Sequence, residues 1–561
     1  MDVVPRIRAF GLSARRPLAI GCTLAVMAAY YAVIMSQAVN IPHWDEYIIT
    51  LDFLDRFDRS GSTWDVVQLL FSQANEHRIA LYRIAILGER ALFGDVDFTR
   101  MIALGNIGVL VFWAILWTSF PRTTDRVYYF LPVTLLLFAP VWERSQWAAS
   151  SFFNTYANVF AFATLYCLSK EPRRYLVAAA ICSVLAIFSF GNGIVVYPAG
   201  LGLLWVARAD RTRLWTWGGV SLVVMVVYFW GYRFTRASIP TSSLFTNPVL
   251  FVAFVFSFFG APLKYFSRYL APFAGVSILA WLLALVLHGR RCRTPYALAS
   301  SFVLFLLLSA GAVAVTRSGF GLAQALSPRY ELIPAGCIAV LYLTSLQSWR
   351  EALKRQFGLI MLCSIVLYAA RMDANYTQIV AFRERLESGM RMYCANDPSA
   401  LSVSPAMQEE VAGLFTCPDP TGNYRPPVES LLKTPDRLTV EEPAMDAEVR
   451  SQVTLEADSD EVYYAKGWAF IDGLDTQGLD VYLVLRSDRG QIFAFRCASH
   501  VMKDVTQDYG HGLYLDESGF SVALPKRRLE IPPGPYDTGI YLVRGEVRAL
   551  QYLGRRIRIP E

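Results

Sequence analysis

The chain of 561 residues is too apolar to be a set of ordinary soluble domains. Hydrophobic residues make up 54% of the sequence and charged residues 17%, and the mean hydropathy is +0.35. The net charge of +6 does not indicate a nucleic-acid partner, because the basic residues stand in short groups between apolar runs. Most of the chain is therefore expected to lie in a membrane.

The apolar runs predict a polytopic α-helical membrane protein with eleven transmembrane helices. The predicted spans are 17–37, 102–120, 127–142, 151–169, 175–189, 194–206, 214–232, 273–287, 296–315, 333–346 and 357–370. A further run, 249–269, is interrupted by Gly260 and Pro262. Because a full crossing needs ~20 apolar residues, we expect this run to form a half-inserted or surface helix.

The basic residues predict the orientation of the spans. Arg6, Arg8, Arg15 and Arg16 precede the first span, which places the amino terminus in the cytoplasm. The later basic groups fall on the same side when the run 249–269 does not cross. The first span is longer than the apolar part of a signal peptide and lacks a small-residue cleavage site. This pattern predicts a bacterial inner (cytoplasmic) membrane protein whose carboxyl-terminal part is periplasmic or extracellular.

The sequence after the last span changes character twice. Residues 1–375 form the predicted transmembrane domain, and 376–442 form an amphipathic helix followed by a proline-containing linker. Residues 443–561 alternate apolar with polar side chains in short runs, which predicts a C-terminal extracytoplasmic β-sandwich domain. The predicted strands are 462–471, 480–486, 491–497, 519–524 and 539–543, with a hairpin turn at 487–490. Its aromatic residues fill a core or line a sugar-binding face, and both readings stay open.

Two cysteines in the linker region are candidates for a disulfide bond. Cys394 and Cys417 bracket a soluble stretch, and a bond between them suits an oxidising exterior. The alternative is a pair of unrelated thiols in a cytoplasmic linker, because sequence spacing does not establish a bridge. Cys497 has no obvious partner.

Two polar clusters stand in the first outer loop, 38–100. They are the segments 43–47 and 75–78, with the sequences HWDEY and NEHR. Asp45 and Glu46 follow the first span directly, so both lie at the lipid boundary, where a carboxylate is costly without a partner or a task. We expect the loop to fold the second cluster over the first and to form one polar site at the outer face.

The outer position of this site limits its chemistry. An enzyme there has no cytoplasmic nucleotide to draw on, and its activated donors are chiefly lipid-linked. Sugar transfer from a polyprenyl phosphate needs a carboxylate to accept the proton of the acceptor hydroxyl and cations to hold the phosphate. Asp45 or Glu46 suits the first role. The outer-facing candidates for the second role are Arg78, Arg317 and Arg329.

These residues resemble the GT-C superfamily of integral-membrane glycosyltransferases, which includes protein O-mannosyltransferases and the aminoarabinose transferase of lipid A. The resemblance consists of the acidic pair after the first helix and the long outer loop. Segments 75–78, 189–193 and 317–330 are similar to segments in uncharacterised bacterial membrane proteins of that type. It covers roughly residues 17–370. The resemblance implies that Asp45 is the catalytic acid, with Glu46 as its neighbour, and by analogy that Arg329 binds the donor phosphate.

The expected function is therefore transfer of a sugar from a polyprenyl-phosphate donor to a cell-envelope glycan or lipid acceptor. Inversion by single displacement is expected, with Asp45 as the base. His43, Glu76 and His77 are expected to support the acceptor. Some GT-C members that build cell-wall polysaccharides also carry a β-domain after their spans, so a role in polysaccharide biosynthesis fits the whole chain.

Other interpretations remain open at this point. In one structural alternative, Asp45 and Glu46 cap a helix or pair with arginines. In another, His77 and Arg78 form a structural salt-bridge network with Glu76. His43 and His77 both stand near carboxylates, which leaves a divalent metal as an alternative to a site without any cofactor. Other classes are a flippase or transporter of lipid-linked sugars, a non-catalytic polysaccharide-assembly protein, and an O-acyltransferase using His77.

Overall fold

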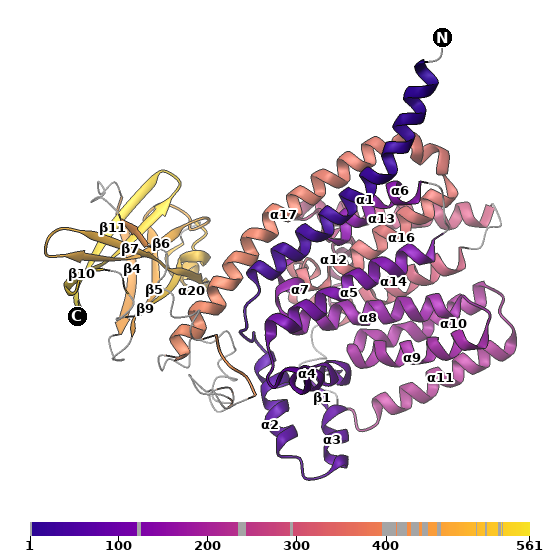
Figure 1. The fold of residues 1–561 in the computed structure, drawn as a ribbon, viewed down its shortest axis with the longest axis horizontal. Coiled ribbons are helices and arrows are strands. Elements are labelled where there is room, and N and C mark those ends of the chain that lie inside the picture. Colours follow the sequence, from indigo (N-terminus) through magenta and orange to yellow (C-terminus); the bar gives the residue numbers. More distant parts are fainter. Residues whose placement is uncertain are drawn as a thin grey trace. The chain divides into compact units, whose positions relative to one another are not determined.

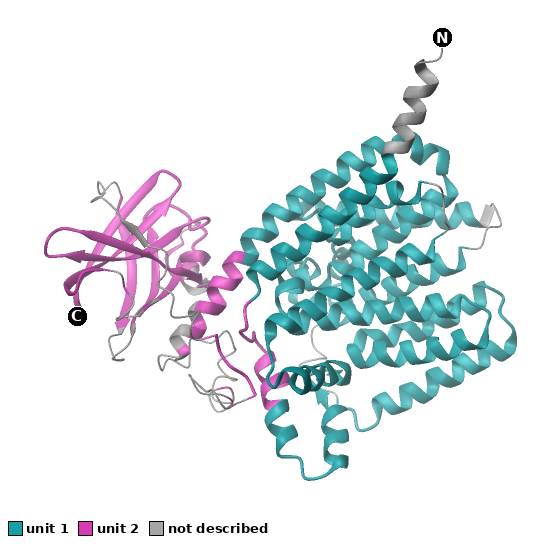
Figure 2. Cartoon of the chain, in the orientation of Figure 1, with its two compact units in different colours: residues 1–38, 53–379 teal, residues 39–52, 380–561 magenta. Residues whose placement is uncertain are grey.

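The computed structural model consists of two compact units, which Figure 2 colours separately. Unit 1 comprises residues 1–38 and 53–379, and unit 2 comprises residues 39–52 and 380–561. The structure describes residues 3–120, 125–233, 243–291, 296–394, 411, 414, 423–427, 437–439, 447–456, 462–500, 502–510, 513–525, 529 and 531–560. Each unit is described by itself.

Unit 1 is a bundle of α-helices (Figure 1). Its helices are α1 (Val3–Gln37), α2 (Phe53–Asp58), α3 (Thr63–Leu70), α4 (Ala80–Phe93), α5 (Phe98–Ser119), α6 (Arg126–Leu137), α7 (Trp142–Gln146), α8 (Ala148–Leu168), α9 (Arg173–Ser189), α10 (Val196–Val206), α11 (Arg211–Phe229), α12 (Pro248–Gly260), α13 (Ala271–Arg291), α14 (Ala297–Arg317), α15 (Leu322–Ala325), α16 (Leu332–Ser348) and α17 (Arg350–Cys394). Short 3-10 turns include η2 (Gly191–Val195) and η7 (Pro328–Tyr330), and a two-stranded ribbon is formed by β1 (Gln73–Ala74) and β2 (His77–Arg78).

Six helices of the described residues are long and apolar enough to cross a membrane. They are Arg15–Gln37, Phe98–Ser119, Arg211–Phe229, Arg268–Gly289, Ala297–Phe320 and Arg350–Glu387. The number rises to seven if the pair Leu322–Tyr330 and Leu332–Ser348, bent by 80°, is one broken span. The described helices are thus compatible with the polytopic membrane protein that the composition predicted.

The remaining four predicted spans also fall on helices, but these helices are shorter or less apolar than the six. They are α6, α8, α9 and α10. The run around Gly260 forms α12, which has 13 residues. At about 1.5 Å per residue this helix is ~20 Å long, and like α6 and α10 it is shorter than the ~30 Å of a bilayer core.

Small residues let the central helices of unit 1 approach closely. Gly105 on α5 faces α8, where an added Cβ atom would overlap the Ser151 hydroxyl. Helices in lipid gain little from the hydrophobic effect and associate instead through such close packing and through polar contacts. The α5–α8 pair therefore forms the tightly packed centre of the bundle.

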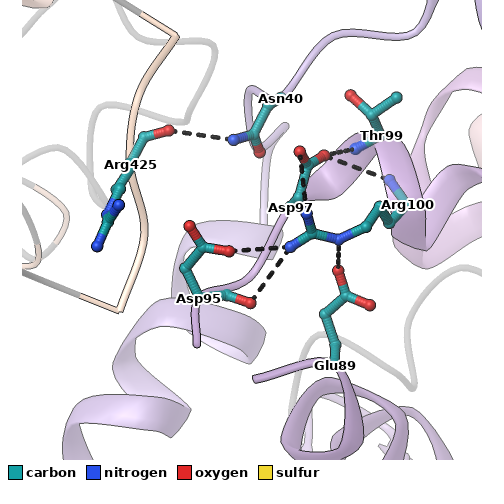
Figure 3. A network of polar contacts seen from close by, with 7 residues as sticks. All are labelled: Asn40, Glu89, Asp95, Asp97, Thr99, Arg100 and Arg425. Carbon is teal, nitrogen blue, oxygen red and sulfur yellow. Dashed lines mark hydrogen bonds and ion pairs between the residues drawn. The ribbon is translucent and has the colours of Figure 1, made fainter. Parts of the chain in front are cut away.

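A polar network fixes the amino-terminal end of α5 (Figure 3). Asp97 caps the helix by accepting from the backbone amide of Thr99 at 2.6 Å. The Arg100 guanidinium donates to Asp95 Oδ1 at 2.9 Å and also pairs with Glu89 on α4. The network thus connects the end of α4 to the start of α5, which is a structural role.

Unit 2 contains the end of α17 and a β-domain. Its strands are β3 (Arg437–Thr439), β4 (Val449–Glu456), β5 (Val462–Ile471), β6 (Asp480–Ser487), β7 (Ile492–Arg496), β8 (Ala498–His500), β9 (Gly519–Pro525), β10 (Gly534–Arg544) and β11 (Val547–Ile559), and it includes the helix α20 (Lys503–Tyr509). A five-stranded sheet has the order β11-β10-β6-β7-β3, and a four-stranded sheet has the order β4-β5-β9-β8. All pairings are antiparallel.

The two sheets share one buried core. It contains Ala465 and Val522 from the four-stranded sheet and Leu483, Phe495 and Leu542 from the five-stranded sheet. The alternating pattern in the sequence predicted these strands, because every second side chain of a strand faces the core. All five predicted strands are confirmed, whereas β3, β4, β8 and β11 were not predicted.

The predicted hairpin is confirmed as the β6–β7 connection. Ser487 N donates to Gln491 O at 2.9 Å, and Gly490 has a φ of +79°. Cys497 is buried, which raises the pKa of its thiol and makes it a core side chain. The predicted bond between Cys394 and Cys417 involves side chains outside the described residues.

Candidate functional site

The first polar cluster, residues 43–47, is a tightly hydrogen-bonded turn in unit 2. His43 N donates to Glu46 Oε2 at 2.7 Å, and Glu46 N donates back to His43 O at 3.1 Å. Ile49 N donates to Asp45 O at 2.8 Å, at the start of the π-helix Tyr47–Asp52. Glu46 is only 1% exposed, so its carboxylate is held inside the turn.

Trp44 gives this turn an unusual backbone. Its φ is +55°, which places a non-glycine residue in the left-handed region. That conformation costs about 1–2 kcal/mol for an L-residue with a Cβ atom. Such strain persists where the surroundings over-determine the conformation, and it is often found at functional sites. Asp45 is the next residue, so its position depends on the strained step.

The His43 ring is neutral at physiological pH. Its ring packs edge-on against Phe382 at the end of α17, with 4.9 Å between centroids. Burial lowers the pKa of His43 to about 3, and the nearby Arg385 lowers it further. The turn is also tied to residues 423–427, where Asn40 Nδ2 donates to Arg425 O at 3.1 Å (Figure 3). His43 therefore contributes a neutral, fixed ring to this cluster.

The second polar cluster lies in unit 1 and joins three segments that the sequence singled out separately. Asn75 forms the turn of the β1–β2 ribbon with a φ of +50°. Glu76 Oε2 lies 3.4 Å from Arg317 Nη2 at the end of α14. The His77 ring lies 3.9 Å from the Phe190 ring, between α9 and η2. Residues 75–78, 189–193 and 317 therefore meet at one place, which we call the His77 cluster.

Two polar atoms in the His77 cluster are buried without a hydrogen-bond partner among the described residues. They are His77 Nδ1 and Asn192 Oδ1. Asn192 Nδ2 donates to Ser309 Oγ at 3.1 Å, which fixes the direction of its amide. Burial, followed by the charge of Arg317, lowers the pKa of His77 to about 4. A neutral imidazole and an amide oxygen are suited to hydrogen bonding with a hydroxyl group.

Arg78 is engaged by the backbone. Its Nε donates to Tyr228 O at 2.8 Å, its Nη2 donates to Trp230 O at 2.6 Å, and its Nη1 donates to Phe71 O. These contacts join the ends of α3 and α11. With all three nitrogens donating to carbonyl oxygens, Arg78 anchors the ends of these two helices to each other.

A third polar group in unit 1 was not recognised in the sequence. Glu331 is 1% exposed and pairs with Lys264 at 3.0 Å and with Arg371 at 2.8 Å. Tyr265 donates its hydroxyl proton to Glu331 Oε2 at 2.6 Å. Burial, followed by the charge of Glu331, raises the pKa of Tyr265, so its hydroxyl remains a donor.

Arg329, the predicted phosphate ligand, belongs to the same region. Its Nε lies 3.5 Å from Glu143 Oε1 on α7, and Ser327 donates to Glu143 Oε2 at 3.1 Å. Arg144, the next residue of α7, is 2% exposed and reaches the hydroxyl of Tyr30 on α1. The cation cluster, as we call this region, contains Lys264, Arg144, Arg329 and Arg371 together with Glu143 and Glu331.

The sequence carried a signal for this cluster that hydropathy alone did not show. Glu331 lies two residues before the predicted span 333–346, and Arg371 directly follows the predicted span 357–370. A charge at such a position is costly in lipid and therefore indicates a partner or a function. The partners come from α7, α12–α13 and α17, which are far apart in the sequence, so the pairing could only be seen in the fold.

Comparisons of the chain with known proteins found no relative that indicates a function. No protein-family model, curated protein or solved structure matches the chain. Within the described part of the chain, no group of three or more His, Cys, Asp or Glu side chains is placed to hold a metal ion. The site residues predicted from the sequence lie in both units. His43, Asp45 and Glu46 form the turn in unit 2, and the others lie in the His77 and cation clusters of unit 1.

Proposed function

We propose that this chain is a membrane glycosyltransferase of GT-C type. It moves a sugar from a polyprenyl-phosphate-linked donor to a cell-envelope glycan or lipid acceptor on the outer face of the membrane. The proposed topology has eleven spans with a cytoplasmic amino terminus, and the β-domain is a sandwich outside the inner membrane. The sugar and the acceptor are selected by pocket shape, which no motif in the sequence encodes.

The observation that carries the proposal is the held turn around Asp45. Asp45 lies eight residues after Gln37, where α1 ends. The strained Trp44 and the buried Glu46 fix the backbone on both sides of it. A surface cap does not require left-handed strain and a buried second carboxylate. A catalytic base does require a fixed position, because proton transfer depends on a defined distance to the acceptor hydroxyl.

In the proposed reaction, Asp45 accepts the proton of the acceptor hydroxyl. The acceptor oxygen forms a bond to the anomeric carbon while the bond from that carbon to the phosphate oxygen breaks. The leaving electron pair stays on the lipid phosphate, whose charge is stabilised by cations. A single displacement of this kind inverts the anomeric configuration. Glu46 orients the turn through the amide of His43.

The proposed cations are Arg317 and Arg329. The guanidinium group of each lies near a carboxylate: Arg317 lies 3.4 Å from Glu76, and Arg329 lies 3.5 Å from Glu143. Pairs of this length are loose compared with the 2.7–2.9 Å of a strong charge-assisted hydrogen bond. Each guanidinium can therefore turn toward a phosphate. In contrast, the Arg78 guanidinium group already donates three hydrogen bonds to backbone carbonyl oxygens.

The experiment that tests the proposal replaces Asp45. We expect Asp45→Asn to fold and insert normally but to lose about a hundred- to ten-thousand-fold of the transfer rate from a polyprenyl-phosphate sugar, or ~3–5 kcal/mol of barrier. The matched control is Asp55→Asn on α2, an acid of the same loop that pairs with Arg59 at the surface. The control should keep the wild-type rate. Near-normal transfer by Asp45→Asn would refute the base assignment, and Glu46 and Glu76 would be tested next.

One observation favours the alternative of a flippase or transporter. Arg371 lies in the candidate span Arg350–Glu387 and is paired with Glu331 in a buried position. Ionisable pairs inside spans are common along transport pathways. Proteoliposomes separate the two functions: a transporter moves a labelled lipid-linked sugar between leaflets without any acceptor, whereas a transferase consumes the donor only when an acceptor is present.

A further inference from the structure

The cation cluster of unit 1 holds more positive charge than its carboxylates balance. Lys264, Arg144, Arg329 and Arg371 stand against Glu143 and Glu331, which leaves an excess of two positive charges. Charged side chains are rarely buried without a counter-ion, because removal from water is strongly unfavourable. A cluster with this imbalance is suited to an anion that is not part of the chain.

Arg144 shows the imbalance most clearly. It is 2% exposed, and its Nε and Nη1 atoms are buried without a hydrogen-bond partner among the described residues. The neighbouring Tyr30 donates its proton to Asn106 Oδ1 at 2.6 Å and is a neutral phenol beside Arg144. A neutral phenol does not compensate the charge of a guanidinium.

Two further arginines of the cluster keep a buried donor of this kind. The Nε atoms of Arg329 and Arg371 are also buried without a hydrogen-bond partner in the described chain. Arg371 is close enough to Tyr30 to act on it electrostatically, as Arg144 does, so the two guanidinium groups share one neighbourhood. Buried donors without a hydrogen-bond partner in the described chain therefore come from three separate elements, α7, η7 and α17.

We infer that the cation cluster binds the phosphate group of a membrane lipid, with Arg144 as its principal ligand. Guanidinium groups present planar pairs of donors that match phosphate oxygens, and they are the side chains that bind phosphate in such a bidentate manner. A phosphate monoester carries about two negative charges. That charge matches the excess in the cluster.

The depth of the cluster favours a lipid as the source of the phosphate. Tyr30 lies seven residues before the end of α1 at Gln37, which corresponds to about 10 Å along the helix. Arg371 likewise lies inside a candidate span. A head group reaches this level from the bilayer, whereas free phosphate would have to leave water for an apolar layer.

The surroundings of Lys264 also fit an apolar chain attached to the phosphate. Beyond Tyr265, the chain exposes Phe266, Tyr269 and Phe273, which are 48%, 70% and 73% exposed. Large exposed apolar side chains next to a polar site indicate contact with lipid or another apolar partner. Identifying this lipid as the polyprenyl monophosphate that the proposed sugar transfer releases rests on the proposed function, but phosphate binding does not.

The test measures binding of three probes to the purified full chain in detergent by native mass spectrometry. The probes are a polyprenyl monophosphate, the corresponding polyprenol without phosphate, and inorganic phosphate. We expect the wild type to bind the first probe and Arg144→Met to bind it about ten- to a hundredfold more weakly, the usual loss for hydrogen bonds to a charged group. Arg450→Met, at an exposed arginine of β4, should bind as the wild type does.

A second readout excludes a merely structural role. Without ligand, Arg144→Met should unfold at the same temperature as the wild type or higher, because it removes a buried charge that lacks a protein counter-ion. Arg144→Lys keeps the charge but not the planar donors and should weaken binding less than Arg144→Met.

The inference fails if neither variant weakens binding, or if the polyprenol binds as tightly as the polyprenyl monophosphate. Equal binding of inorganic phosphate would overturn the lipid source. Loss of transfer in Asp45→Asn with intact lipid binding keeps the two proposals distinct.

Discussion

Glu331 and Arg371 form a buried ion pair, with 2.8 Å between Oε1 and Nη2 and with side chains only 1% and 2% exposed. Lys264 and Tyr265 also bind the same carboxylate. The pair links Glu331, at the start of α16, to Arg371 on α17. It is therefore a structural centre of the cation cluster.

Replacing this acid should destabilise the protein strongly. Glu331→Gln leaves Arg371 and Lys264 buried without their carboxylate, and breaking a buried pair on one side typically costs about 3–5 kcal/mol. The measurement is the unfolding midpoint in detergent. Glu351→Gln is the matched control, because Glu351 pairs with Lys354 at the surface and should give no measurable change. Equal midpoints for Glu331→Gln and the wild type would show that the pair does not stabilise the bundle.

The fold was predictable where a local pattern decides it. The strand 462–471 was predicted with its observed bounds, because its side chains alternate between core and surface along the whole element. In the helices, the sequence showed apolar length but not continuity. The last predicted span ends at 370, whereas α17 runs from Arg350 to Cys394 without a break.

The candidate site was only partly predictable for the same reason. The segments around Asp45 and His77 stood out because carboxylates and histidines follow an apolar run. Arg144 did not stand out, since its burial depends on α1, α5 and α17 packing around a five-residue helix. Charge balance is a property of the assembled cluster, and no window of the sequence contains it.

The strained backbone at Trp44 gives a second prediction. Glycine adopts a positive φ without the penalty of a Cβ atom, so Trp44→Gly should be more stable than Trp44→Ala by about 1 kcal/mol. Both variants remove the same indole ring, so their difference reports the backbone alone. The measurement is again the unfolding midpoint of the two variants side by side.

Trp64 on α3 provides the opposite case. It is an exposed residue in an ordinary helix, where glycine costs about 1 kcal/mol relative to alanine. Trp64→Gly should therefore be less stable than Trp64→Ala. The same sign at both positions would argue against the left-handed conformation of Trp44 in the folded protein.

The buried His77 predicts a fall in stability at mildly acidic pH. Its pKa is about 4 in the fold, whereas the unfolded chain binds the proton near the ordinary value of 6.5. Between these values the unfolded state carries more protons, so its free energy is lowered and stability decreases as the pH falls through this window. His77→Gln removes this contribution and should flatten the dependence of the unfolding midpoint on pH.

The measurement is clearest from about pH 6.5 down to about pH 5, since most carboxylates remain ionised there. His43 also has a lowered pKa and should leave a residual slope in His77→Gln. His288→Gln serves as the control at a histidine outside both polar clusters, and it should keep the slope of the wild type. An unchanged slope in His77→Gln would mean that the imidazole ring of His77 is not buried as a neutral group.

The close packing around Gly193 predicts that the His77 cluster does not tolerate an added side chain at this position. An added Cβ atom would overlap the carbonyl group of Ala186 and lie 2.5 Å from Ile187 N, both of them backbone groups of α9. Gly193→Ala must therefore shift η2 away from α9, and overpacking of this kind typically costs about 1–3 kcal/mol. Phe190 and Asn192 move with η2, so the variant should also lose activity through the His77 cluster.

Gly218→Ala on α11 separates this steric effect from helix propensity. No atom lies within 4 Å of a Cβ added there, so the substitution should be neutral or stabilise the helix by up to about 1 kcal/mol. Unfolding midpoints and transfer rates of both variants measure the contrast. Because the neighbours of Gly193 are backbone atoms rather than flexible side chains, local repacking cannot absorb the extra methyl group. A Gly193→Ala protein as stable and active as Gly218→Ala would show that η2 does not pack against α9 as closely as the fold requires.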